Sequence, residues 1–212
     1  MDDFAYQKFI ELCNTPSDIN EHLPILYSYG TECESVIELG VRGCVSSWAF
    51  LCGLLENGSP VKKMFLNDIN PCDITEFLQV TSILPIEVNY QWINDLDLVI
   101  KEPVDITFID TWHIYGQLKR ELAKYSKVTK KYIIMHDTTV DEFDGETIRN
   151  GWDAEIQSVE SGFPVEEINC GLGRAIDEFL WENSTEWELA DKYINNNGLT
   201  VLQRCTFSPI IN

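Results

Sequence analysis

Apolar residues recur along the chain with two different spacings. Short apolar runs that end on polar side chains predict buried β-strands at residues 35–40, 63–68, 86–93, 104–110 and 132–137. Stretches with apolar residues three and four positions apart predict helices between these strands, at residues 46–55, 73–83 and 115–125. Strands that alternate with helices predict an α/β fold, an open and mostly parallel sheet with helices on both faces.

The two ends of the chain have other patterns. The first thirty residues have helical spacing, and Ser17 is suited to cap a second helix within them. Residues 138–163 are acidic and partly helical in pattern, and residues 173–182 predict another helix. Two predicted strands at 187–193 and 199–205 flank the turn-forming run Asn195-Asn-Asn-Gly198, which predicts a closing hairpin.

Polar side chains that can bind a ligand stand at the ends of four predicted strands. They are Glu38 with Gly40, Asp68, Asp110, and His136 with Asp137. Because the carboxyl ends of parallel strands meet at one edge of a sheet, we expect these groups to converge. A nucleoside-like cofactor would lie at that edge.

The first strand-to-helix turn, residues 40–43, limits which nucleoside fits. A dinucleotide site needs a glycine where Arg42 stands, because the backbone there approaches the pyrophosphate. S-adenosylmethionine (SAM) carries no phosphate, and Glu38 beside the turn suits its positive charges. Asp68 can accept hydrogen bonds from both ribose hydroxyls. The expected SAM contacts are Glu38, Gly40, Arg42, Ser46 and Asp68, with Asn94 and Asp95 bonding the adenine amine.

Composition and charge narrow the range of partners. The chain has 212 residues, 44% of them hydrophobic and 24% charged, as in a single globular domain. Its formal net charge of −20 disfavours nucleic acid and anionic membranes as partners. The chain has neither a membrane-spanning apolar run nor a secretion signal, so we expect a soluble, cytoplasmic protein. Seven scattered cysteines without a C-x-x-C pair argue against disulfides and zinc.

Six short motifs stand between about residue 17 and residue 204 of the chain. They are Glu21-His-Leu-Pro-Ile-Leu26, Val36-Ile-Glu-Leu-Gly-Val-Arg-Gly43 with Ser46-Ser47, Phe108-Ile-Asp-Thr-Trp-His-Ile-Tyr115, Met135-His-Asp-Thr138, Ala175-Ile-Asp-Glu-Phe-Leu180 and Asn195-Asn-Asn-Gly-Leu-Thr-Val-Leu202. In combination they resemble a group of small class I SAM-dependent methyltransferases. That group belongs to the sugar O-methyltransferases related to the cephalosporin-hydroxylase-like and rhamnosyl methyltransferase families.

The resemblance implies a fold and a reaction. The fold is a Rossmann-like SAM-binding sheet of seven strands, the last of them antiparallel, in a core of residues 31–212. N-terminal helices in residues 1–30 would cover the cofactor cleft. The reaction is methyl transfer to a sugar hydroxyl, such as that of rhamnose or another deoxyhexose in a glycan, assisted by a divalent cation.

The resemblance also assigns roles at the strand ends. It places Asp110, His136 and Asp137 around the cation, with His113 as general base. His136 stands where related enzymes commonly have a carboxylate, so Mg²⁺ would have two firm oxygen ligands, whereas Mn²⁺ would also accept an imidazole. The chemistry fits, because a sugar hydroxyl is a poor nucleophile until its proton is removed.

Acceptor contacts are expected near the start of the helix predicted at residues 115–125. Trp112 and Tyr115 can lie against the apolar face of a pyranose. The acidic stretch 141–153 predicts a solvated surface loop. If this loop is mobile, it would be a lid on the acceptor side of the site. An anionic acceptor such as a nucleotide sugar would need a local basic patch, for which Arg149, Arg174 and Lys192 are candidates.

Other functions stay open at the level of sequence. Chelation of a vicinal diol serves a catechol-like small-molecule O-methyltransferase equally well. A non-catalytic SAM-binding or glycan-binding module would not need Asp110, His113 and Asp137 together. A nicotinamide dehydrogenase is disfavoured by the missing glycine. The sequence is compatible with a homo-oligomer but does not give the number of subunits.

Overall fold

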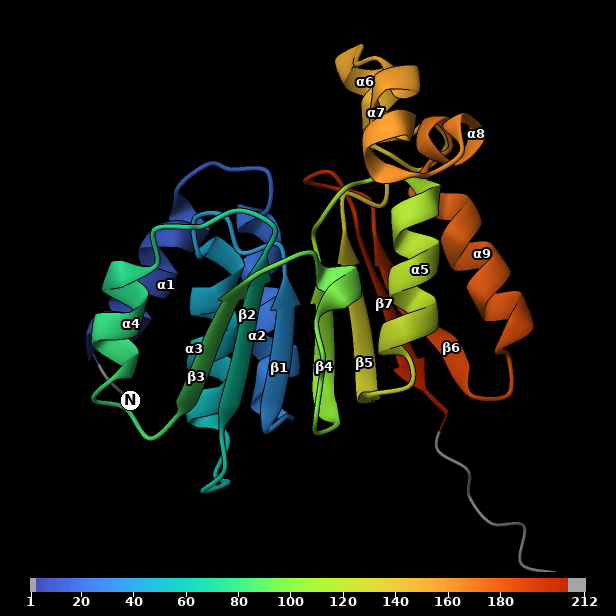
Figure 1. The fold of residues 1–212 in the computed structure, drawn as a ribbon. Helices are drawn as coiled ribbons and strands as arrows, with labels where there is room; N and C mark the ends of the chain where they lie inside the picture. The colour runs from blue at the N-terminus through green and yellow to red at the C-terminus, as the bar shows by residue number, and fades with distance from the viewer. Residues whose placement is uncertain (1–2, 206–212) are drawn as a thin grey trace, which may run out of the picture.

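Seven strands form one sheet in the computed structural model, which describes residues 3–205 (Figure 1). They are β1 (Ser35–Leu39), β2 (Lys63–Asp68), β3 (Glu87–Trp92), β4 (Val104–Ile109), β5 (Thr129–His136), β6 (Trp187–Tyr193) and β7 (Leu199–Arg204). Their order is β3-β2-β1-β4-β5-β7-β6, with β1 to β5 parallel and β7 antiparallel to both its neighbours. The predicted α/β fold, with its antiparallel C-terminal strand, is confirmed. Residues 1–2 and 206–212, which belong to the expected ranges 1–30 and 31–212, lie outside the described residues.

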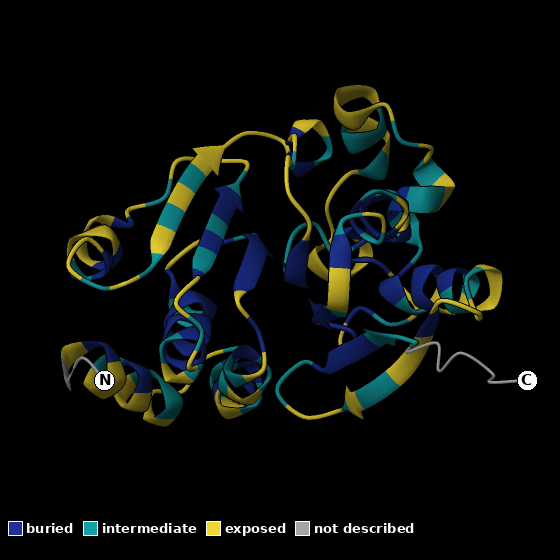
Figure 2. Ribbon diagram, turned by 90° about the horizontal axis from the view of Figure 1, so that it is seen from below, coloured by how far each residue is buried: buried dark blue, intermediate teal, exposed yellow. Residues whose placement is uncertain are grey.

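Helices cover both faces of this sheet, as predicted (Figure 2). They are α1 (Asp3–Asn14), α2 (Leu23–Thr31), α3 (Val45–Glu56), α4 (Thr75–Thr81), α5 (Tyr115–Tyr125), α6 (Glu146–Asn150), α7 (Ala154–Ser161), α8 (Val165–Asn169) and α9 (Leu172–Glu182), with 3-10 turns η1 (Asn20–His22) and η2 (Asp95–Asp97). None of the helices within residues 3–205 is long and apolar enough to cross a membrane.

Two apolar clusters, one on each face, hold the sheet between its helices. Val36 and Ile134 pack with residues of α1, α2 and α3, whereas Ile37 and Ile133 pack with residues of α5 and α9. Neighbouring residues of one strand thus point to opposite faces, as the two-residue period of a strand requires. The central strands are apolar on both sides because both of their faces are buried.

The strand order reverses between β1 and β4, since β1 continues to β2 and β3 on one side while β4 continues to β5 on the other (Figure 1). In sheets of this kind the loops that leave two such strands diverge and open a crevice. The polar strand ends predicted from the sequence therefore lie around that crevice.

The N-terminal segment differs from the prediction at Ser17. Its hydroxyl accepts the Ile19 backbone N–H at 3.3 Å and caps no α-helix, because α2 begins only at Leu23. Pro24 stands in the first turn of α2, where a missing N–H costs no hydrogen bond. The segment before it is held by the β6–β7 turn, whose Asn196 side chain donates to the Ser17 carbonyl at 2.8 Å.

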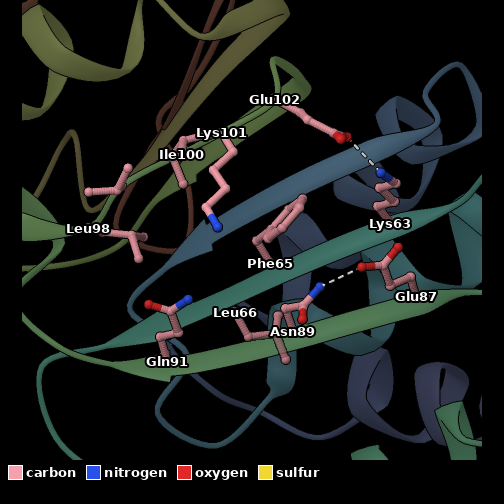
Figure 3. A pocket seen from close by; sticks show the side chains of 11 residues that line it. Lys63, Phe65, Leu66, Glu87, Asn89, Gln91, Leu98, Ile100, Lys101 and Glu102 are labelled. Atoms are coloured by element: carbon pink, nitrogen blue, oxygen red, sulfur yellow. Dashed lines mark hydrogen bonds and ion pairs between the residues drawn. The ribbon is translucent and has the colours of Figure 1, made fainter.

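The connection from β3 to β4 carries no α-helix, since residues 93–103 contain only the 3-10 turn η2. No helix of this connection therefore covers β2 and β3, and a hollow of about 300 Å³ lies between these strands and residues 98–102. Figure 3 shows that polar pairs occupy its rim, Lys63 with Glu102 at 2.7 Å and Asn89 with Glu87 at 2.9 Å. This hollow lies on the flank of the sheet, apart from the polar strand ends.

Helices α6, α7 and α8 form a cap segment, residues 146–169, which projects beyond the sheet above α5 (Figure 1). Asp153 begins α7 by accepting the backbone N–H groups of Glu155 and Ile156 at 2.9 and 3.1 Å. The sequence predicted only partial helix here, and the observed helices are short.

Helices α2 and α3 approach each other closely at a pair of glycines. A Cβ added to Gly53 would lie 2.4 Å from the Tyr27 carbonyl oxygen and 2.9 Å from the Gly30 Cα. Gly53→Ala should therefore lower the free energy of unfolding by about 1–3 kcal/mol, the usual cost of overpacking. Urea unfolding measures this change. Gly58→Ala is the matched control, because a Cβ there would contact nothing within 4 Å, and equal stability of the two variants would contradict the close approach.

Candidate active site

A cleft of about 970 Å³ opens at the carboxyl ends of β1, β2 and β4. Its lining includes seven of the residues expected from the sequence to bind SAM or the acceptor. These are Gly40, Arg42, Ser46, Asp68, Asn94, Asp95 and Trp112, and they are joined there by Asp110, His113 and Asp137. Among residues 3–30, Asp18 and Ile19 are the ones that line the cleft, while α1 and α2 pack against α3.

The turn after β1 is built from unusual backbone conformations. Gly40 has a φ of +89°, and a Cβ there would lie 1.9 Å from the Asp110 carbonyl oxygen. Arg42 also has positive φ, 41°. Asp68 holds the turn in place, since its Oδ2 accepts the backbone N–H groups of Val41 at 3.1 Å and Arg42 at 3.0 Å. Residue 40 therefore has to be a glycine, and the backbone there has no side chain that would keep a ligand at a distance.

Glu38 lies beneath the turn and does not line the cleft. It is fully buried, and the hydroxyls of Ser46 and Ser47 donate to its two carboxylate oxygens. Burial raises the pKa of Glu38 to about 7, although the two serine hydroxyls oppose the shift. The structure therefore does not place the Glu38 carboxylate at the surface of the cleft, where the sequence led us to expect a direct SAM contact, and Ser46 lines the cleft there.

The expected adenine residues, Asn94 and Asp95, begin η2 at the far side of the cleft. Asn94 uses its side-chain oxygen to cap η2, accepting the Leu96 N–H at 2.9 Å. Asp95 receives the Gln117 amide on Oδ1 at 2.9 Å, and its carboxyl group also faces the buried carboxyl group of Glu121 on α5. Burial raises the pKa of both carboxyl groups, so the pair can share a proton.

Asp110, His113 and Asp137 form a compact cluster at the ends of β4 and β5. Their nitrogen and oxygen atoms lie within 4.8 Å of one another, a spacing that could hold a metal ion. His113 Nε2 lies 3.1 Å from Asp110 Oδ1, and His113 Nδ1 lies 3.0 Å from Asp137 Oδ2. The imidazole is therefore placed between two carboxylates.

This position changes the protonation of His113. Burial alone would lower its pKa, but hydrogen bonds to Asp110 and Asp137 raise the pKa of His113 well above its ordinary value. Burial likewise opposes ionisation of Asp110, yet the neighbouring histidines hold the Asp110 pKa below its ordinary value. Without a cation, His113 is a charged imidazolium at neutral pH and has no lone pair with which to accept a proton.

His136, which was expected to bind the cation, is not one of the three residues whose ligand atoms lie close enough together to hold a metal. Those residues are Asp110, His113 and Asp137. His136 Nε2 lies 3.2 Å from the Asn196 carbonyl oxygen, which fixes that nitrogen as the donor. Its Nδ1 lies 3.4 Å from Asp110 Oδ1 and 3.3 Å from Asp137 Oδ1. His136 is buried and contributes no surface to the cleft.

The acidic stretch 141–153 is not simply a solvated loop, as the sequence suggested. Asp141 is fully buried and receives Arg149 Nε and an Arg149 terminal nitrogen at 2.7 and 2.8 Å. Glu146 reaches the cluster, accepting the His113 backbone N–H at 3.2 Å. Asp137 itself has φ of +57°, a strained value for a non-glycine residue that is typical of functional sites.

The two aromatic residues expected to contact an acceptor lie in different places. Trp112 lines the cleft and stacks on Phe163 of the cap segment, with ring centroids 6.0 Å apart. Tyr115 is buried and does not line it, because it starts α5 on the side that faces α9, where its hydroxyl donates to Glu178 at 2.6 Å. The structure therefore does not place Tyr115 at the cleft, where the sequence led us to expect an acceptor contact.

Sequence reasoning missed the cleft residues of the cap segment. They are Glu146, Trp152, Gln157, Glu160 and Phe163. No periodicity marks them, since each belongs to a short helix or loop whose position is set by contacts with α5 and α8 rather than by local pattern. The one usable signal was two aromatic residues, Trp152 and Phe163, in an otherwise acidic segment.

No family model and no curated protein sequence matches the chain. Solved structures match it in fold. TomG, a SAM-bound O-methyltransferase of tomaymycin synthesis from Streptomyces achromogenes, is 12% identical, with a TM-score of 0.60 over 97% of this chain and 92% of TomG. The methyltransferase PaMTH1 from Podospora anserina, bound to S-adenosylhomocysteine (SAH), is 10% identical, with a TM-score of 0.59 over 97% and 89%. The N-methyltransferase NodS from Bradyrhizobium japonicum WM9 is 12% identical, with a TM-score of 0.55 over 88% and 95%. The chain thus has the Rossmann-like methyltransferase fold.

Burial of Glu38 makes stability depend on pH. The folded-state pKa, about 7, lies above the ordinary value of 4.5, so folding favours the protonated acid. The stabilisation is complete below pH 4.5 and is lost as the pH rises through 7. Between pH 5 and pH 8, wild-type protein should therefore lose about 2–3 kcal/mol more stability than Glu38→Gln, as measured by urea unfolding.

Glu34→Gln is the control for this experiment, since Glu34 is exposed and directly precedes the same strand. Its stability should follow the wild-type dependence on pH. Parallel pH profiles for wild type and Glu38→Gln would show that Glu38 is already ionised in the folded protein at pH 5, against this assignment.

Proposed function

We propose that the protein transfers the methyl group of SAM to a hydroxyl of a small acceptor. The observation that carries this proposal is that a single cleft holds both the Gly40 turn with Asp68 and the cluster of Asp110, His113 and Asp137. The first set suits a nucleoside, and the second suits the activation of a hydroxyl. The SAM and SAH bound to neighbours of the same fold support the choice of cofactor.

SAM would lie across the carboxyl ends of β1 and β2. Asp68 accepts three backbone N–H groups, one of them on Oδ1, and would accept the ribose hydroxyls with the lone pairs that remain on that oxygen. The adenine amine would lie at Asn94 and Asp95, which line the cleft at the start of η2. The turn at Gly40 lets the chain approach the methionine part without a side chain between them.

The residues around Asp110 fit a divalent cation, because several buried atoms of the group are close to one another but are not joined by well-directed hydrogen bonds. His113 Nδ1, His136 Nδ1 and Asp137 Oδ1 make ion-pair contacts and no hydrogen bond of good geometry within the described residues. Asp110 and Asp137 would supply oxygen ligands to the ion, and a nitrogen ligand from His113, if it binds the ion, would favour Mn²⁺ over Mg²⁺. Such an ion supplies a positive charge that lowers the pKa of a bound hydroxyl.

We assign the removal of the hydroxyl proton to His113. Its raised pKa depends on the negative charges of Asp110 and Asp137, so positive charge placed on those carboxylates lowers the pKa of His113 and frees a nitrogen. If instead a cation uses that nitrogen directly, His113 is a ligand and not a base. The two roles make different predictions for one variant.

The acceptor in this proposal is a sugar hydroxyl, as in rhamnose or another deoxyhexose of a glycan. Trp112 and the half-exposed Trp152 offer ring faces on which the apolar side of a pyranose can lie. A catechol ring would fit the same surfaces, and a module that only binds SAM or glycan would retain the cleft without transfer.

An acceptor panel tests the proposed function. The protein is incubated with SAM, Mn²⁺ or Mg²⁺, and separate pyranoses and catechols, and mass spectrometry identifies methylated products. Methylation of a sugar supports the proposal, and methylation of catechols alone replaces the sugar with an aromatic diol. Absence of any product, under conditions in which SAM binds, would leave a non-catalytic binding module.

His113→Gln separates base from ligand. If His113 is the base, the variant should lower kcat by about 10²–10⁴-fold at every metal concentration, because proton transfer contributes that much to hydroxyl activation. Affinity for SAM, measured by calorimetry, should stay within about twofold, since a lost base removes no cofactor contact. Recovery of kcat at high Mn²⁺ would contradict the base assignment and make His113 a ligand.

A further inference from the structure

The acceptor side of the cleft is strongly acidic. The cap segment, residues 146–169, contains six acidic residues and one basic residue. Two of the six, Glu146 and Glu160, line the cleft. Glu146 is bonded to the His113 backbone, whereas Glu160 is exposed and makes no hydrogen bond or ion pair within the described residues. Glu160 therefore keeps a full negative charge available to a ligand.

The basic side chains that could balance this charge are bound elsewhere. Arg149, Arg174 and Lys192, the candidates for an anion-binding patch, pair with Asp141, Glu178 and Glu142 at 2.7, 2.8 and 2.9 Å, and none lines the cleft. Arg42 is the one Lys or Arg among the described cleft residues, and Asp18 holds it at 2.7 Å. A phosphate or carboxylate on the acceptor would meet carboxylates without a free cation to offset them.

Aromatic rings line the same cleft as this unpaired carboxylate. Trp152 is 49% exposed and makes no ring contact with another described residue. Trp112 is stacked on Phe163, over which the Arg120 guanidinium lies 4.1 Å from the ring centroid. Trp152 thus presents an aromatic ring that is not stacked on another described ring. A cleft that offers both an exposed tryptophan face and an unpaired carboxylate is a suitable environment for an ammonium group.

We propose that the acceptor carries a positive charge, as in an amino sugar or an aryl-alkylamine with a free hydroxyl, and that Glu160 and Trp152 bind its cationic group. The inference rests on the proposed function for the hydroxyl that is methylated. It adds the charge of the acceptor and two residues that select it.

Binding measurements test this without requiring turnover. Two series of probes have matched rings and different charge: glucosamine, glucose and glucuronate, and dopamine, 4-methylcatechol and 3,4-dihydroxybenzoate. Each is titrated calorimetrically into the protein alone and into the protein saturated with SAH. In at least one series the cation should bind about tenfold more tightly than the neutral member, with the anion weakest, since an exposed ion pair and a cation–π contact together give that order of preference. High salt should reduce the preference.

Matched variants locate the effect. Glu160→Gln should remove most of the preference for the cation, whereas Glu155→Gln, on the same helix but outside the cleft, should retain it. Trp152→Leu should weaken binding of the cation more than that of the neutral probe. Trp181→Leu, which alters a tryptophan that is 85% exposed on α9, should change neither.

Several results would overturn the proposal. They are equal binding of cation and neutral probe, tighter binding of the anion, no binding of either cation, or equal losses in the Glu160 and Glu155 variants. The proposed function fails separately, by an absence of methylated product. A protein that selects cations but transfers no methyl group would keep the charge preference and lose the reaction.

Discussion

The contact between the turn after β1 and the end of β4 determines where everything else in the cleft can lie. Gly40 sits so close to the Asp110 carbonyl that any side chain at residue 40 would collide with backbone. The Asp110 N–H donates to the Leu39 carbonyl and the Gly40 N–H to the Asn67 carbonyl, each at 2.9 Å, so three strand ends are fixed together. The turn at Gly40 and the cluster of Asp110, His113 and Asp137 are therefore neighbours. Methyl transfer needs such proximity, because cofactor and acceptor must meet in line.

The sequence predicted the strands, most of the helices and the strand-end residues, because these depend on local pattern. A buried strand is apolar on both faces, and its polar end is visible in one dimension, which is how Asp68, Asp110 and Asp137 were found. Roles that depend on a few ångströms were not predictable. The resemblance implied that His136 binds a cation and that His113 acts as the base, yet of the two histidines only His113 lines the cleft, where it lies between two carboxylates. Tyr115 was misplaced because its side chain depends on where α5 begins and on its packing against α9.

The cap segment was the least predictable part of the cleft. Its helices are short, and their cleft residues come from positions without periodicity, so only tertiary contacts place them. Tertiary contacts also determine which charged side chains are paired with one another, and composition alone does not show this. A net charge of −20 gives the sign of the overall field, but the pairing of Arg149 with Asp141 and of Arg42 with Asp18 leaves the acceptor side without a free cation. The burial of Glu38 also depends on tertiary structure: its carboxylate accepts a hydrogen bond from Ser46 and does not line the cleft.

Calorimetric titration of SAM into the protein tests the central claim, that this cleft is a SAM site, most directly. The account predicts one SAM per chain with a dissociation constant in the micromolar range. Asp68→Ala should weaken binding by about tenfold or more, the effect of about 1.4 kcal/mol of lost hydrogen bonding. Asp97→Ala, an exposed residue of η2 outside the cleft, should bind as wild type does. Absence of heat from folded protein at high micromolar SAM, or equal affinity in wild type and Asp68→Ala, would contradict it.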